Sequence, residues 1–352
     1  MKHTETKVTI AVDAMGGDHG ASVVIPSLVR VSQHYTEGFF ILYGDEAQIE
    51  AQLSEHPSLR SITRVEHCEM AIPMDMKPAR ALRVGRRVSS MWQAIEAVKA
   101  GQAQACLSAG NTGALMAMSK IILRTHAGIE RPPIAGLWPT LEGESVVLDV
   151  GATIGGTASQ YVQFAVMGVA YAKIVLGLDN PRVALLNIGI EDIKGTDSIK
   201  HAAELLSSSN LNFIGFIEAD AIGRGEADVV VTDGFTGNVA VKAAEGTSRQ
   251  ISAILKISME RSLMARLGFF LARGAFTTLR GKMNPNASNG GMLLGLRGSV
   301  IKSHGGVDAE GFAIAAEVAI EVAKADIASV IERDIEAMQT LLDEAWAEEV
   351  EG

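Results

Sequence analysis

The chain has 352 residues, with 31 lysines and arginines against 41 aspartates and glutamates, which gives a net charge of −10. An acidic chain has no overall attraction for phosphate backbones, so we do not expect a nucleic-acid-binding protein. Two cysteines are too few for a disulfide framework or a cysteine-built zinc site. No signal peptide or membrane-spanning run is recognisable, which predicts a cytoplasmic protein.

Short apolar runs alternate along the chain with glycine-rich turns. The runs cover residues 8–12, 39–43, 105–107, 146–150, 183–186 and 229–231. Most are rich in β-branched residues, which is typical of strands buried on both faces of a parallel sheet. Stretches with helical periodicity lie between or after them, at residues 89–100, 158–176, 197–207, 238–257 and 309–346.

The repeated order of strand, glycine turn and helix predicts an α/β fold. We expect a mostly parallel sheet flanked by helices, an αβα sandwich. No internal repeat, low-complexity tract or linker divides the chain, so the prediction is one catalytic domain over residues 1–350.

Residues 251–286 depart from this repeated order of strand, glycine turn and helix. Between Lys256 and Lys282 six basic residues accompany a single Glu260 in an otherwise acidic protein, and several apolar side chains share helical spacing. This composition predicts a basic, amphipathic helical excursion from the domain.

Glycine loops follow at least five of the predicted strands. In an open parallel sheet the ligand crevice lies beyond the carboxyl ends of the strands, so we expect these loops to gather there. Glycine lets the backbone approach a ligand, and a following helix offers amide N–H groups to an anion. Such a site suits phosphate or the oxyanion of acyl transfer. The motifs of P-loop ATPases, dinucleotide-binding enzymes, nucleophile-elbow hydrolases and H-E-x-x-H metalloenzymes are missing from the sequence.

Several longer motifs occur in order between about residues 8 and 325. They include AVDAMGGD at 11–18, SAGNTGALMA at 108–117, LDVGA at 148–152, QFAVMGVAYA at 163–172, TDGFTGNVAVK at 232–242 and LLGLRGSVIKSHG at 293–305. Together they resemble the phosphate acyltransferases of the PlsX family.

The resemblance implies a reaction, a fold and partners. Family members transfer a long-chain acyl group from acyl carrier protein to inorganic phosphate, giving acyl phosphate for phospholipid synthesis. The fold is expected to be similar to phosphotransacetylases and isocitrate-dehydrogenase-like enzymes. The resemblance also implies a homodimer, peripheral association with an anionic membrane, a membrane acyltransferase that uses the acyl phosphate, and no metal or organic cofactor.

The chemistry of this reaction agrees with the residues present. Phosphate is an anionic nucleophile at neutral pH and a thiolate is a good leaving group, so no Ser-His-Asp or Cys-His nucleophile is required. The reaction needs phosphate held beside the thioester, together with donors for the tetrahedral oxyanion.

Two residues are expected to be catalytic. Lys194 follows the predicted strand 183–186, where a cation would neutralise phosphate and polarise the acyl carbonyl; the alternative is an exposed loop lysine. Asn238 stands where the segment DGFTGN enters a helix, so its amide would hold the oxyanion or the phosphate; the alternative is an ordinary N-cap.

The candidates for phosphate or substrate binding all lie in the loops after strands. They are Ser108, Gly110, Asn111, Thr112, Gly113, Asp233, Gly234, Gly237, Asp13, Gly16, Gly17 and His304. Turn and cap roles are the alternative for the asparagines, serines and aspartates. His304 would act as the acid for the departing thiolate or be a plain loop histidine, and Lys302 beside it is interpreted in the same way.

Two surfaces are expected to meet larger partners. Arg80, Arg83, Arg86 and Arg87 form a basic patch that would dock the acidic acyl carrier protein, or simply a solvated helix face. Leu263, Leu267, Phe269 and Phe270 would enter the membrane or shape the acyl groove; the alternative is a helical hairpin packed in the dimer.

The sequence departs from the family pattern after LDVGA. Thr153 and Gly155 stand where the family usually has asparagine and an acidic residue. Two rival functions stay open at this point. One is a phosphotransacetylase that uses short acyl-CoA, and the other is a non-catalytic scaffold on the membrane.

Overall fold

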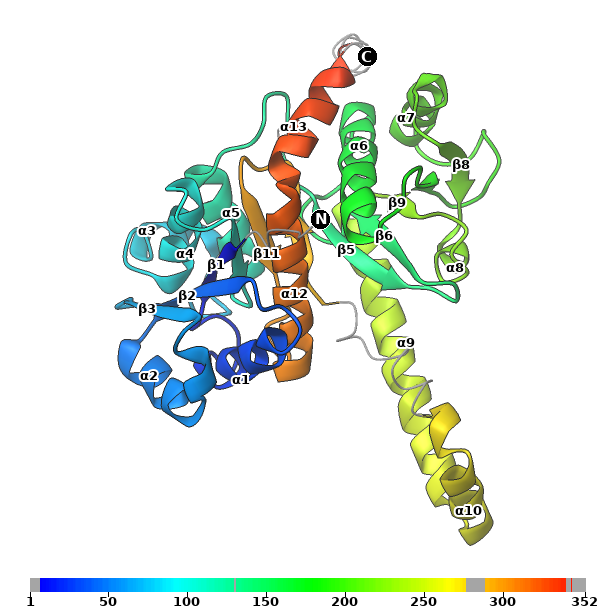
Figure 1. Ribbon diagram of the computed structural model, residues 1–352. Helices are drawn as coiled ribbons and strands as arrows, with labels where there is room; N and C mark the ends of the chain where they lie inside the picture. Colours follow the sequence, from blue (N-terminus) through cyan, green and yellow to red (C-terminus); the bar gives the residue numbers. More distant parts are fainter. Residues whose placement is uncertain (1–6, 130, 277–288, 340–342, 344–352) are drawn as a thin grey trace, which may run out of the picture.

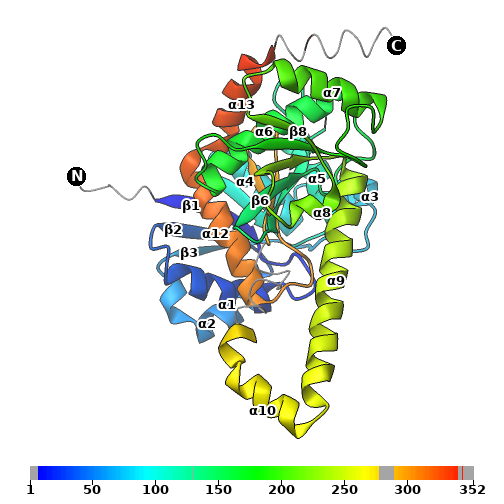
Figure 2. The same ribbon diagram turned by 90° about the vertical axis from the view of Figure 1, so that its right-hand side faces the viewer.

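The computed structural model describes residues 7–129, 131–276, 289–339 and 343 (Figures 1 and 2). In this part of the chain eleven strands form one sheet, in the order β3-β2-β1-β4-β11-β10-β5-β6-β9-β7-β8. The strands are β1 Val8–Asp13, β2 Gly38–Gly44, β3 Thr63–His67, β4 Ala105–Ser108, β5 Ile134–Pro139, β6 Glu144–Leu148, β7 Val183–Leu186, β8 Phe213–Ile217, β9 Val229–Val231, β10 Gly291–Leu293 and β11 Ser299–Lys302.

The centre of the sheet reverses its direction. β10 is antiparallel to both β11 and β5, and β5 is antiparallel to β6, whereas the other strand pairs are parallel. Three reversals make the block β3-β2-β1-β4-β11 run opposite to the block β6-β9-β7-β8. The glycine loops of the two blocks therefore leave their strands in opposite directions, which differs from the expectation of a single direction.

Helices cover both faces of the sheet. The helices are α1 Ala21–Ser32, α2 Glu46–Glu55, α3 Pro78–Val84, α4 Ser90–Lys99, α5 Thr112–Ile122, α6 Ala158–Val175, α7 Asp197–Ser208, α8 Ala219–Ile222, α9 Gly234–Glu260, α10 Leu263–Leu271, α12 Ala309–Ala325 and α13 Ile327–Ala337. Helices α1, α6 and α12 pack on one face of the sheet and form the large apolar core there. Helices α4, α5 and α8 pack on the other face and form two smaller apolar cores. This is the predicted mostly parallel α/β sandwich.

The predicted helices are found, with two differences in extent. The helix expected at residues 238–257 is longer, because the side chain of Asp233 accepts the amides of Phe235 and Thr236 and starts α9 at Gly234. The helix expected over 309–346 is broken, because Asp326 adopts a left-handed conformation with φ 47° between α12 and α13.

An arm extends from the body of the molecule (Figures 1 and 2). It consists of the second half of α9 and the whole of α10, and it corresponds to the predicted excursion at 251–286, of which residues 277–286 lie outside the described part. Among the described helices none is both long and apolar enough to cross a membrane.

Candidate active site

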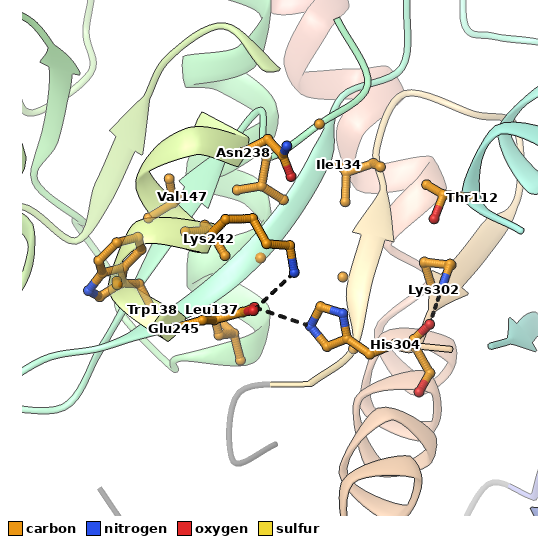
Figure 3. A pocket seen from close by; sticks show the side chains of 18 of the residues that line it. Thr112, Ile134, Leu137, Trp138, Val147, Asn238, Lys242, Glu245, Lys302 and His304 are labelled. Atoms are coloured by element: carbon orange, nitrogen blue, oxygen red, sulfur yellow. Dashed lines mark hydrogen bonds and ion pairs between the residues drawn. The ribbon is translucent and has the colours of Figure 1, made fainter. Parts of the chain in front are cut away.

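A cavity of about 550 Å³ lies over the central strands, between the first turn of α5 and the side of α9. Both apolar and polar side chains line it (Figure 3). Apolar side chains occupy one part of the wall: Ile134, Leu137, Trp138, Val147, Val150 and Val241. Polar side chains also line the cavity: Thr112, Asn238, Lys242, Glu245, Ser248, Lys302, Ser303 and His304. The volume is that of an ordinary small-ligand pocket.

Helix α9 supplies a row of polar groups to this cavity. Asn238, Lys242 and Glu245 stand four and three residues apart, so they share one face of the helix. The Glu245 carboxylate lies 3.0 Å from the Lys242 Nζ and 3.1 Å from an Arg249 guanidinium nitrogen. His304 Nε2 lies 4.0 Å from the same carboxylate (Figure 3). Desolvation lowers the pKa of His304, so its ring is largely neutral at pH 7.

The start of α9 is held by Asp149, at the end of β6. Its buried carboxylate accepts amide hydrogen bonds from Ile134, Gly151 and Ala152 at 3.0 Å and from Thr153 at 2.8 Å. Burial raises the pKa of Asp149, and the amide donors oppose that shift. This one side chain therefore orders the loop after β6, which runs directly beneath the first turn of α9.

Gly234 and Gly237 are needed because that loop crosses the helix so closely. A Cβ on Gly234 would lie 2.5 Å from both the Asp149 Oδ2 and the Thr153 amide, and a Cβ on Gly237 would lie 2.0 Å from the Asp149 carbonyl oxygen. Thr153, a departure from the family pattern, accepts the Gly234 amide at 3.0 Å through its hydroxyl. These glycines therefore fix the position of Asn238 and do not line the cavity themselves.

The loops after β1 and β4 form a second compact group beside the cavity. The Ser108 hydroxyl donates to Asp13 Oδ2 at 2.7 Å and accepts the Gly110 amide at 3.0 Å. A Cβ on Gly16 would lie 2.8 Å from the Gly110 nitrogen, and one on Gly17 would lie 2.7 Å from the Gly305 carbonyl oxygen. Burial raises the pKa of Asp13. These contacts pack the two loops together, and the residues that make them do not line the cavity.

Asn111 links this group to the basic segment. Its side chain caps α5 by accepting the Ala114 amide at 2.9 Å, and its amide group donates to the carbonyls of Met74 and Met76 at 2.6 and 3.0 Å. Gly113 packs against the ring of Pro78 at the start of α3. The exposed side chains of the basic patch, Arg80, Arg83, Arg86 and Arg87, therefore lie close to the end of the cavity where Thr112 stands.

Of the sequence-predicted residues, the structure brings Thr112, Asn238 and His304 to the same cavity. Lys194 does not line it: the residue is exposed in the loop after β7, where its carbonyl accepts a hydrogen bond from Asn187. Three neighbours in this loop, Ile188, Ile190 and Ile193, are also strongly exposed. The catalytic role of Lys194 stays a prediction.

Sequence reasoning missed three groups: Asp149, Lys242 and Glu245. Lys242 and Glu245 follow Asn238 at i+4 and i+7, a helical spacing that indicates a shared face once Asn238 is a candidate. Lys302, for which the sequence leaves a catalytic and a plain loop role open, ends β11 and lines the cavity. Nothing in the sequence indicates that four backbone amides converge on Asp149.

A family model described as "Fatty acid synthesis protein" matches residues 8–330. The chain belongs to this family. Two relatives in the family, the phosphate acyltransferases of Nitrobacter hamburgensis and Mesorhizobium japonicum, are 55% and 52% identical to it over 332 residues. The matches cover 94% of this chain and 94% and 93% of the relatives. The predicted family and the predicted enzyme class, an acyltransferase, are thereby confirmed.

Solved structures confirm the fold of this family member. A phosphotransacetylase from Streptococcus pyogenes superposes with a TM-score of 0.62 at 19% identity, over 91% of this chain and 94% of that one. The EutD phosphotransacetylase from Staphylococcus aureus gives 0.59 at 16% identity, over 92% and 96%. At such low identity the likeness shows the fold alone, and it matches the predicted similarity to phosphotransacetylases.

Proposed function

We propose that the chain transfers a long-chain fatty acyl group from acyl carrier protein to inorganic phosphate, giving acyl phosphate and the free carrier thiol. The observation that carries this proposal is the cavity with two kinds of wall. Leu137, Trp138 and Val147 offer an apolar surface for the acyl chain, and Lys302 with Thr112 offers donors to an anion (Figure 3). A thioester and a phosphate ion need these two environments within one cavity.

The reaction runs by direct attack. A phosphate oxygen attacks the thioester carbon, the carbonyl oxygen becomes an oxyanion, and the carbon–sulfur bond breaks as the thiolate leaves. The Asn238 amide, fixed at the start of α9, is placed to donate to that oxyanion, and a single donor of this kind contributes about 3–4 kcal/mol. Burial raises the pKa of Cys68 to about 12 and also raises that of the fully buried Cys106, so neither thiol serves as a nucleophile near neutral pH.

The basic patch at Arg80, Arg83, Arg86 and Arg87 is the proposed docking surface for acyl carrier protein. All four side chains are exposed, and none of them forms an ion pair with another described residue. Asn111 ties the segment before this patch to the loop that leads to Thr112. An acidic carrier bound here would stand near the Thr112 end of the cavity, and complementary charge would speed its association.

Reversing the charge of this patch is expected to raise the KM for acyl carrier protein but not the KM for phosphate. The double variant Arg83→Glu, Arg86→Glu should raise the KM for acyl carrier protein by about tenfold or more, with little change in the KM for phosphate. The measurement is steady-state turnover at low salt and at 0.5 M salt. At 0.5 M salt, screening should narrow the difference in carrier KM between the variant and wild type. Arg30→Glu, on the opposite face of the sheet, is the control. An unchanged carrier KM would place docking elsewhere.

The arm is proposed to bind an anionic membrane surface. Met264, Phe270 and Leu271 expose 77%, 70% and 78% of their surface on α10, and exposed Arg266 lies among them. The Phe269 ring lies 4.9 Å from that of Phe276. The side chains of Leu263 and Leu267 lie outside the described residues. Apolar groups beside basic ones are the arrangement of interfacial helices.

Placing a charge on this arm is expected to release the protein from vesicles. Phe270→Glu should lower co-sedimentation with anionic vesicles by about tenfold while turnover of a soluble acyl donor stays within twofold of wild type. Leu141→Glu, an exposed apolar position in the β5–β6 turn, should leave binding intact. Equal binding by Phe270→Glu and wild type would remove the arm from the membrane contact.

The predicted homodimer belongs to the same proposal. The exposed isoleucines at positions 251, 254 and 257 lie along α9, and those at 188, 190 and 193 lie beside Lys194. Clusters of exposed large apolar side chains are typical of interaction surfaces. Acyl phosphate made by such a dimer would pass to a membrane acyltransferase, which is the expected downstream partner.

The runner-up is transfer from a short acyl-CoA, which the phosphotransacetylase-like fold favours. Comparing kcat/KM for palmitoyl-acyl carrier protein and acetyl-CoA at saturating phosphate decides between them. The proposal predicts a preference of at least 100-fold for the palmitoyl carrier. A preference for acetyl-CoA would establish the runner-up instead.

A further inference from the structure

Lys302 ends β11 at the inner end of the cavity. In the sheet it lies beside Ser108 of β4 on one side and Gly291 of β10 on the other. Its Nζ donates to the carbonyl oxygens of Ala109, at 3.4 Å, and of Ser303. An ammonium group has three donors, so two carbonyl partners leave one for a ligand in the cavity.

Among the described residues no carboxylate lies within ion-pair distance of Lys302. The charged groups that face it are Asp13 from β1, Asp18 from the loop after β1, Lys242 from α9, and His304 in its own loop. The Ser108 hydroxyl donates to Asp13 Oδ2, whereas Asp13 Oδ1 is buried without a hydrogen-bond partner. The Glu245 carboxylate contacts Lys242, Arg249 and His304. Lys302 is therefore a cation among the polar lining residues of the cavity, with carbonyl partners but, among the described residues, without an anion at ion-pair distance.

A partly buried, desolvated cation without a counter-ion favours its neutral form. Desolvation lowers the pKa of Lys302 to about 8, against the raising effect of Asp13 and Asp18. The group is charged below this value and loses its proton as the pH rises through it. An anion bound in the cavity would supply the missing partner and restore the charged form.

A second feature at the same end of the cavity favours an anion. Thr112, which lines the cavity with Lys302, is the first residue of the eleven-residue helix α5. The amino end of a helix carries a partial positive charge and amide donors that favour a bound anion. The helix end and the lysine therefore act on one volume (Figure 3).

We propose that the Lys302 ammonium is the phosphate-binding cation of this cavity, and that inorganic phosphate binds between it and the first turn of α5. This inference rests on phosphate as the acyl acceptor. When phosphate binds above pH 8, the neutral form of Lys302 takes up a proton from the solvent. The product is an ion pair between the Lys302 ammonium group and the phosphate dianion. Phosphate affinity should therefore fall as the pH rises from 8 to 9.5, because the proton must first be taken up.

Calorimetry with inorganic phosphate at pH 8.5 tests this directly. Titrations in two buffers of different ionisation enthalpy count the protons exchanged. Wild type should take up protons on binding phosphate, because the neutral fraction of Lys302 must be protonated to form the ion pair. Lys302→Met should bind phosphate about 100-fold more weakly and take up no proton, since a charged hydrogen bond is lost.

Two controls make the result specific. Lys173→Met removes an exposed charge on α6 outside the cavity and should match wild type. Lys302→Met should melt at the same or a higher temperature than wild type, because it removes a desolvated charge, whereas a structural lysine would lower the melting temperature. Lys302→Gln serves as a second variant.

Two further outcomes separate the assignment of Lys302 from the proposed function. Wild-type turnover with phosphate but no phosphate-linked proton uptake, or unchanged phosphate affinity in both Lys302 variants, would overturn the assignment of Lys302 alone. Folded wild type that neither binds phosphate nor uses it would contradict the proposed function, and with it this inference.

Discussion

Gly237→Ala is expected to abolish turnover and to lower the free energy of unfolding by about 3 kcal/mol or more. The new Cβ would lie 2.0 Å from the Asp149 carbonyl oxygen and 3.0 Å from both the Asp149 carbonyl carbon and the Thr232 Cγ2. Two of these are backbone atoms, so no side-chain rotation can relieve the overlap. The first turn of α9 must move away from the loop after β6, and Asn238, the next residue, moves with it.

Helix α9 offers a matched control for this change. Gly246 lies in the same helix, and a Cβ there would meet no heavy atom within 4 Å. Gly246→Ala should therefore stabilise the protein by about 0.5–1 kcal/mol, the helix propensity difference, and leave turnover unchanged. Denaturant unfolding and phosphate-dependent thiol release measure both effects. Wild-type stability and turnover in Gly237→Ala would show that the close crossing of α9 and the β6 loop is absent.

Asp149→Asn is expected to lower stability by about 2–4 kcal/mol and turnover by at least 100-fold. The carboxylate accepts four backbone amides with two oxygens, and the Thr153 amide bonds to Oδ2 at 2.8 Å. An asparagine keeps one oxygen, and its NH₂ group would face amide donors that it cannot accept. The loop beneath α9 would then rearrange, and the acyl-transfer geometry at Asn238 would be lost.

Asp179→Asn removes an exposed carboxylate from the loop before β7 and serves as the comparison. Its stability should stay within about 0.5 kcal/mol of wild type, as for most surface changes. Equal unfolding free energies for Asp149→Asn and Asp179→Asn would mean that the amide cluster does not hold the loop.

The regular part of the fold could be predicted from the sequence because its signals are local. The apolar run at 183–186 is strand β7, and the periodic stretch at 158–176 is helix α6. Strands β3, β5, β8, β10 and β11 were missed, and with β5 and β10 the reversal of the sheet, because strand pairing is decided by distant segments. The break at Asp326 was missed because the apolar periodicity continues across it into α13.

The site was predictable where a residue lies in a motif, and not where tertiary packing creates the role. Thr112, Asn238 and His304 were expected from their loops and meet in one cavity. Asp149 and Lys302 depend on contacts with segments far away in the sequence: Ile134 for the first and Ala109 for the second. The Ser108 hydroxyl donates to Asp13, and the ligand contacts expected of both residues stay predictions.

The most direct test of the central claim follows thiol and acyl phosphate together. Purified protein is incubated with palmitoyl-acyl carrier protein and inorganic phosphate, with Asn238→Ala and Lys194→Ala alongside. The account predicts one acyl phosphate for each thiol released, no release without phosphate, and a loss of about 100-fold or more in Asn238→Ala. Thiol release that does not need phosphate, or no release by folded wild type, would contradict it.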